Sequence, residues 1–154
     1  MDTFYQTWFA VRYVHVAAAA LLIGGAFTTG ALSASDALAS DSAGVRGVAI
    51  LYERIFWLVT GVSVATGISN LGLKGEGLLG PDTTWGTALL FKLSAVLVLL
   101  ILSLARVDFL ARCSAADVVD PRRERIALAA FYGVTALLLL GILWGGLGLA
   151  HGRY

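Results

Sequence analysis

Four long runs of apolar residues with almost no charge constrain this chain more than any other feature of its sequence. The runs cover residues 8–32, 55–73, 83–105 and 126–150. Each run suits a helix of about 20 residues, which is the length that crosses the hydrocarbon core of a bilayer. Transmembrane strands alternate in polarity and end after about 10 residues, so runs of this length favour helices. The sequence therefore predicts one all-α membrane domain over residues 1–154, a bundle of four transmembrane helices.

The composition excludes several other classes of protein. Only 14% of the 154 residues are charged, against roughly 25% in a soluble domain, which argues strongly against a soluble globular enzyme. A hydrophobic content of 58% also excludes a disordered chain. A net charge of +1 provides no basic surface for nucleic acid. The expected partner is the lipid bilayer, with a larger membrane complex or a second copy of the chain as further candidates.

The distribution of basic residues predicts an orientation in the membrane. Seven arginines flank the first and third loops, namely Arg46, Arg54, Arg106, Arg112, Arg122, Arg123 and Arg125. The second loop and the chain ends contribute Lys74 and Arg153. Cytoplasmic loops of membrane proteins carry an excess of basic residues. We therefore expect a multi-pass protein of a bacterial inner membrane with both termini in the periplasm. The acidic start, Met1-Asp2-Thr3, is unlike a signal peptide, so we expect the first span to be retained.

Three titratable residues interrupt the spans near the predicted outer surface. Arg12 and His15 lie three residues apart and share a face of the first helix. His15 follows Trp8 by seven residues and Lys92 follows Trp85 by seven residues, a depth of about 10 Å on each helix. Both helices enter from the same side, so we expect Lys92 to face the bundle interior at the level of His15. Such side chains are costly in a span unless they face the bundle, water or a ligand.

Each of these residues also has a simpler interpretation. Lys92 can extend its ammonium to the interface, and His15 can be a neutral imidazole bonded to a neighbouring helix. Arg12 can be an interfacial anchor. His151 follows the fourth span at the same surface, where it is either a terminal side chain or a second ligand. The sequence alone leaves these alternatives open.

Other polar and small residues at helical spacing predict contacts between helices. A stripe on the second span, formed by Thr60, Ser63, Thr66 and Asn70, is typical of hydroxyl and amide groups that join membrane helices. Small residues that predict close packing are Ala26 with Gly30, Gly61, Gly67, and Gly141 with Gly145. The chain contains no catalytic motif of a soluble enzyme, and whether it catalyses a reaction is open. Its one cysteine, Cys113, cannot form an internal disulfide.

Two short stretches resemble known membrane families. The segment Arg12-Tyr13-Val14-His15-Val16 resembles the first helix of copper-resistance protein D domains, and residues 85–93 resemble their later helix with its buried lysine. The related four-helix membrane protoporphyrinogen oxidases share this histidine and lysine. They also place an arginine near the second helix, which Tyr52-Glu53-Arg54 resembles. The resemblance implies a four-helix membrane fold and a redox or copper-related function.

The sequence also departs from both families. The oxidases have an Asn-Glu-x-Pro stretch in the fourth helix that has no counterpart in residues 130–150, which argues against porphyrinogen oxidation. Copper(I) prefers soft Met and Cys ligands, and this chain offers only Met1 and Cys113. Copper uptake is therefore an alternative that depends on the resemblance.

The remaining interpretation is haem b binding. Haem iron accepts one or two axial ligands in a helical bundle, and His15 would supply the nitrogen. Arg12 and Lys92 would pair with the propionates, and His151 is a candidate for the sixth position. Small residues that leave room for a flat macrocycle lie at 17–20, Gly67, Gly145 and Gly146. We expect a haem protein in electron transfer, with a non-catalytic accessory subunit of a larger membrane complex as the alternative.

Overall fold

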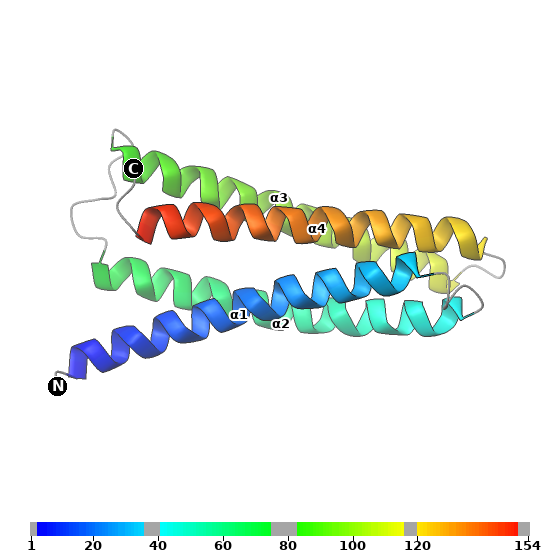
Figure 1. Cartoon of the computed structure of the whole chain (residues 1–154), viewed down its shortest axis with the longest axis horizontal. Coiled ribbons are helices and arrows are strands. Elements are labelled where there is room, and N and C mark those ends of the chain that lie inside the picture. The colour runs from blue at the N-terminus through cyan, green and yellow to red at the C-terminus, as the bar shows by residue number, and fades with distance from the viewer. Residues whose placement is uncertain (1–2, 36–40, 75–82, 116–119, 151–154) are drawn as a thin grey trace.

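Four long antiparallel helices make up the protein in a computed structural model, which describes residues 3–35, 41–74, 83–115 and 120–150 (Figure 1). The helices are α1 (Thr3–Ala34), α2 (Ser42–Lys74), α3 (Thr84–Ala115) and α4 (Pro121–Ala150). Each contains a segment long and apolar enough to cross a membrane. These ranges contain no strand. The predicted all-α bundle of four membrane-spanning helices is therefore confirmed, and the chain is a multi-pass membrane protein.

The helices are longer than the apolar runs that predict them. α2 begins at Ser42 instead of near residue 55, and α3 continues to Ala115 instead of ending near residue 105. The 32 residues of α3 extend about 48 Å at 1.5 Å per residue, while a hydrocarbon core is about 30 Å thick. A charged residue is costly in lipid but does not end a helix, so counting charges underestimates helix length.

Three of the helices begin at a polar side chain that accepts a hydrogen bond from a backbone N–H of the first turn. The pairs are Asp41 with Gly44 at 2.9 Å, Thr83 with Gly86 at 2.9 Å and Asp120 with Arg122 at 3.0 Å. Such caps satisfy N–H groups that have no partner within the helix. Proline has no N–H to satisfy, which suits Pro121 as the first residue of α4.

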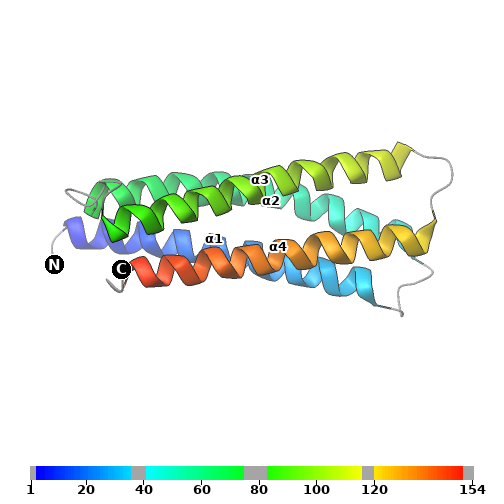
Figure 2. The same ribbon diagram turned by 90° about the horizontal axis from the view of Figure 1, so that it is seen from above.

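The bundle has two distinct ends. The end where α1 begins and α4 finishes is called here the terminal end, and the opposite end, with the predicted arginine-rich loops, is called the arginine end (Figures 1 and 2). α1 makes its main contacts with α2 and α4, whereas α3 packs chiefly on α4 and only lightly on α2. The best-buried large side chains lie toward the arginine end, namely Phe56, Arg106, Leu128 and Tyr132.

Lipid-facing apolar side chains cover the outside of the bundle. On α3 they run from Leu90 to Val107, a length of about 25 Å along the helix axis. This length is close to the thickness of a bilayer core. Arg106 therefore lies at the last turn of the apolar belt, and its side chain is fully buried.

Small residues bring α1 close to its neighbours, but not at every predicted position. A Cβ on Gly30 would lie 3.3 Å from Cβ of Tyr132 on α4, and Ala26, one turn away, is fully buried. The expectation of close packing is wrong for Gly61, Gly141 and Gly145, where a Cβ would meet no described atom within 4 Å. Spacing predicts which residues share a face, but the orientation of that face depends on the neighbouring helices.

Candidate functional site

His15 is held on α1 by two oxygen atoms of α2. Its Nδ1 lies 2.9 Å from the carbonyl oxygen of Ser63 and 3.1 Å from Oγ1 of Thr66. A carbonyl oxygen can only accept a hydrogen bond, so Nδ1 carries the proton and donates it. In the neutral imidazole, Nε2 then carries the free lone pair. The bond to a neighbouring helix, which is the simpler interpretation of His15, is therefore present, and it leaves the other ring nitrogen able to bind a ligand.

Thr66 is itself oriented by the backbone of α2. Its hydroxyl lies 2.8 Å from the carbonyl oxygen of Val62 and donates to it. Because the single hydroxyl proton is used there, the Thr66 oxygen can only accept from His15. The Ser63 carbonyl and the Thr66 hydroxyl therefore both accept from Nδ1 of His15, which fixes the tautomer and the orientation of the imidazole.

Lys92 approaches the same region from α3. Its side chain is half-buried, and Nζ lies 3.2 Å from the position that a Cβ on Gly146 of α4 would take. The ammonium and the His15 imidazole are close enough to interact electrostatically. Arg106 of α3 contacts Thr135 of α4, and the two helices are antiparallel. Moving from Thr135 to Gly146 on α4 therefore corresponds to moving from Arg106 to about residue 95 on α3. The Lys92 ammonium thus stays inside the bundle and does not extend toward the terminal end.

Glycines lie against both polar side chains. A Cβ on Gly67 would lie 3.4 Å from Cε1 of His15. A Cβ on Gly146 would contact the Lys92 ammonium, and one on Gly145 would meet no described atom within 4 Å. Larger residues at Gly67 or Gly146 would press on the imidazole or the ammonium.

The polar stripe of α2 is only partly used between helices. Ser63 and Thr66 bind His15, as described above. The buried atoms Oγ1 of Thr60 and Oδ1 of Asn70 have no hydrogen-bond partner within the described ranges. A buried polar atom without a partner costs about 1–3 kcal/mol. Asn70 lies one helical turn beyond Thr66 on α2, toward the terminal end.

Arg12, another of the predicted site residues, does not join this group. Arg12 is exposed, and its guanidinium carbon lies 5.3 Å from the centroid of the Trp8 ring. This cation–π contact is typical of a side chain anchored near the membrane surface. His151 lies outside the described residues, as do Met1 and Arg153.

A second polar cluster, which the sequence analysis missed, lies toward the arginine end. Nε of Arg106 on α3 lies 2.7 Å from Oε1 of Glu53 on α2. The hydroxyl groups of Tyr132 and Ser103 donate to the two Glu53 oxygens at 2.9 and 3.0 Å. Arg106 also donates to Thr135 on α4. The cluster joins three helices through one buried ion pair.

The Glu53–Arg106 pair is fully satisfied by its surroundings. Each Glu53 oxygen accepts two hydrogen bonds, because Arg106 also donates to Oε2 at 3.3 Å. The guanidinium carbon lies 4.9 Å from the centroid of Phe56 and 5.2 Å from that of Tyr132. A carboxylate offers about four acceptor positions, so none is left for a ligand. This arrangement indicates a structural role.

Arginines counted as loop flanks are thus partly internal, which corrects the sequence interpretation. Arg106 lies within α3 and is fully buried. Arg46 forms a two-pronged ion pair with the buried Glu124 of α4, at 2.6 and 2.7 Å. Arg125 donates to the carbonyls of Ser33 and Ser35 at the end of α1. The sequence did contain a signal for the Glu53–Arg106 pair. The two residues have opposite charges and lie toward the same end of the bundle on consecutive antiparallel helices.

Metal sites made only of protein ligands are not seen in the part of the chain that the structure describes. No group of three or more His, Cys, Asp or Glu side chains comes together there. Cys113 is buried near the arginine end, far along the bundle from His15. Comparisons of the chain with models of protein families, with curated proteins and with solved structures found no match.

Proposed function

We propose that this membrane protein binds haem b in the terminal half of the bundle, with Nε2 of His15 as axial ligand, and takes part in electron transfer. The observation that carries the proposal is the bond from Nδ1 to the Ser63 carbonyl at 2.9 Å. Histidines that bind metals commonly donate their other N–H to a carbonyl or carboxylate, which fixes the tautomer and raises the basicity of the ligand. His15 has this arrangement within a span.

The surrounding residues fit a haem better than a bare metal ion. A metal held only by protein needs several ligands, whereas haem iron already has four nitrogens and requires one residue. Lys92 provides a cation inside the bundle at about the level of His15, and Gly67 and Gly146, which lie against the imidazole and the ammonium, add no side chain that would compete with a flat group. Copper, the alternative cofactor, has no comparable set of ligands in the described ranges.

The two propionates of haem b would need cationic partners in this low-dielectric region. Lys92 would pair with one of them. Arg12 lies one turn before His15 on α1 and would pair with the other, in exchange for its contact with Trp8. His151, after α4, is the candidate for a sixth ligand. With both termini in the periplasm of a bacterial inner membrane, the site would lie in the outer leaflet.

Bound haem would supply one-electron exchange between ferric and ferrous iron. Ser63 and Thr66 would hold the imidazole in one orientation. The positive charge of Lys92 would favour the more negative, reduced state and raise the potential. The packed helices would keep bulk water away from the bound haem.

An absorption spectrum with a pyridine haemochrome assay tests the proposal on the purified chain. The wild-type protein should show a Soret band, and His15→Ala should lose it while still inserting in the membrane. Lys92→Met should keep the axial bond but retain haem less well or show a lower potential. A full complement of haem in His15→Ala would contradict the assignment. If the wild-type protein never takes up haem, the accessory-subunit interpretation replaces it, and co-purification with a larger complex would test that.

A further inference from the structure

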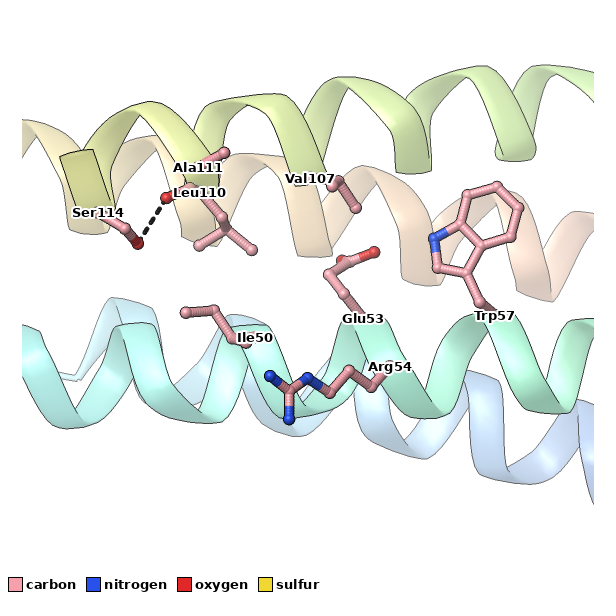
Figure 3. Close-up of a pocket in the computed structure, with 8 residues that line it drawn as sticks. All are labelled: Ile50, Glu53, Arg54, Trp57, Val107, Leu110, Ala111 and Ser114. Atoms are coloured by element: carbon pink, nitrogen blue, oxygen red, sulfur yellow. Dashed lines mark hydrogen bonds between the residues drawn. The ribbon is translucent and has the colours of Figure 1, made fainter.

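A groove opens between α2 and α3 toward the arginine end, away from the His15 site (Figure 3). Its volume is about 370 Å³, within the range of small-molecule sites. The walls are mainly apolar, with Ile50 and Trp57 on α2 and Val107, Leu110 and Ala111 on α3. The groove lies where these two helices have few contacts, so it is open to the lipid phase.

Glu53, which is paired with Arg106, lines this groove. Both side chains are almost completely buried and bound to each other, and Tyr132 donates a hydrogen bond to Glu53. Because every acceptor position of Glu53 is used, a molecule in the groove would meet an apolar surface beside a neutralised ion pair. The small side chain of Ala111 leaves the space open on the α3 side.

Arg54 provides an unpaired positive charge at the rim of the groove. Its side chain is exposed and runs along α2 toward Ile50, in the direction of the arginine end (Figure 3). Within the described ranges it forms no ion pair or hydrogen bond, whereas Arg46, Arg112 and Arg123 each pair with a carboxylate. The exposed neighbours Leu51 and Ile55 are apolar. Arg54 is therefore a cation without a counter-charge at the edge of the lipid-facing belt.

We propose that this groove binds an anionic phospholipid, with one acyl chain between α2 and α3 and the phosphate on Arg54. The apolar walls match a hydrocarbon chain, and the rim cation matches a headgroup with net negative charge. The direction of the Arg54 side chain places the phosphate toward the arginine end, where a headgroup lies, and the chain toward Trp57. A zwitterionic lipid carries its own cation and would gain less from Arg54. A protein helix would need an acidic residue at this level.

Trp57 lines the groove and can report its occupant. The full chain with Trp8→Phe, Trp85→Phe and Trp144→Phe keeps Trp57 as its single tryptophan. It would be reconstituted in phosphatidylcholine vesicles containing a minor fraction of brominated phosphatidylglycerol, or the same fraction of brominated phosphatidylcholine. Bromine quenches tryptophan on contact. We expect brominated phosphatidylglycerol to quench Trp57 about fivefold more effectively than brominated phosphatidylcholine. A preference of this size is what the attraction of an anionic lipid to one cation near the membrane surface provides.

Matched variants separate the groove from general attraction to the membrane. Arg54→Gln should abolish the preference, while Arg123→Gln, which removes an equal charge at the same end, should keep it. Ala111→Phe should fill the groove and remove the preference, while Ala105→Phe, at an exposed position of α3 outside the groove, should not. Equal quenching by the two lipids in the parent, or a preference that survives Arg54→Gln, would overturn the proposal. So would the absence of quenching by either lipid, which would indicate that a second copy or another helix covers the groove.

Discussion

Tyr52 on α2 occupies the space where a side chain on Gly25 of α1 would lie. Cε2 of the tyrosine is 2.5 Å from the position that a Cβ on Gly25 would take. Two carbon atoms that are not bonded to each other cannot come so close. The Tyr52 hydroxyl donates to the carbonyl oxygen of Leu22 at 3.0 Å. The absence of a side chain at Gly25 therefore lets one ring both pack on α1 and bond to its backbone.

The first prediction concerns this contact. Gly25→Ala should destabilise the bundle by about 1–3 kcal/mol, because the Tyr52 ring must shift and weaken its bond to Leu22. Gly24→Ala is the matched control, since a Cβ there meets no described atom within 4 Å. Thermal unfolding in detergent can be followed by the reaction of Cys113, the single cysteine, with a thiol dye. Cys113 is buried, so its labelling reports unfolding. Equal midpoints for the two variants would contradict the prediction.

The second prediction concerns the buried ion pair. Glu53→Gln leaves the Arg106 charge without its partner and should destabilise the protein by about 3–5 kcal/mol. The double variant Glu53→Gln with Arg106→Met should recover much of this loss, because no charge remains buried. Asp108→Asn, which breaks the exposed pair with Arg112, should change stability by no more than about 0.5 kcal/mol. A double variant less stable than Glu53→Gln alone would show that the pair itself stabilises the bundle.

The third prediction tests the space beside His15 without changing His15. If haem lies there, Gly67→Leu should lose most of the Soret absorbance, because the added side chain fills the volume next to the imidazole. Gly61→Leu lies on the same helix with open space around it and should retain haem. Thr66→Val should also retain haem, since the Ser63 carbonyl still holds Nδ1. Comparable haem content in Gly67→Leu and Gly61→Leu would move the site elsewhere.

The fourth prediction concerns orientation. In a Cys113→Ala background, single cysteines at Ser40 and Gly77 report the first and second loops. Gly77→Cys should react with an impermeant thiol reagent in intact cells, and Ser40→Cys should react only after the membrane is opened. The reason is the excess of arginines around loops one and three, which remains when the buried Arg106 is left out of the count. The reverse pattern would place both termini in the cytoplasm.

The number and type of helices could be predicted from the sequence, because hydrophobicity over about 20 residues is a strong signal. The capping role of Asp120 could also be predicted, since a cap depends on local sequence. The Glu53–Arg106 pair could not be found by counting charges. Both residues lie at the edges of the apolar runs, and that count assigns them to loops. Their burial depends on how α2 and α3 are aligned, which is a tertiary property.

The environment of His15 shows the same limit. The sequence places His15 and Lys92 at similar depths, which depends only on helix rise and direction. The partner of Nδ1 is a backbone carbonyl of Ser63, and every residue offers such a group. No side-chain pattern marks one carbonyl in advance, so the tautomer of His15 required the structure.

The ion pair between α2 and α3 also bears on how the chain enters the membrane. A helix that carries only Glu53, or only Arg106, meets a penalty of several kcal/mol when that residue reaches the lipid alone. The two helices follow each other in the chain and run antiparallel, so they can neutralise these charges before either one is released into the bilayer. We therefore expect the insertion machinery to hold α2 until α3 has been made, and to deliver the two as a helical hairpin.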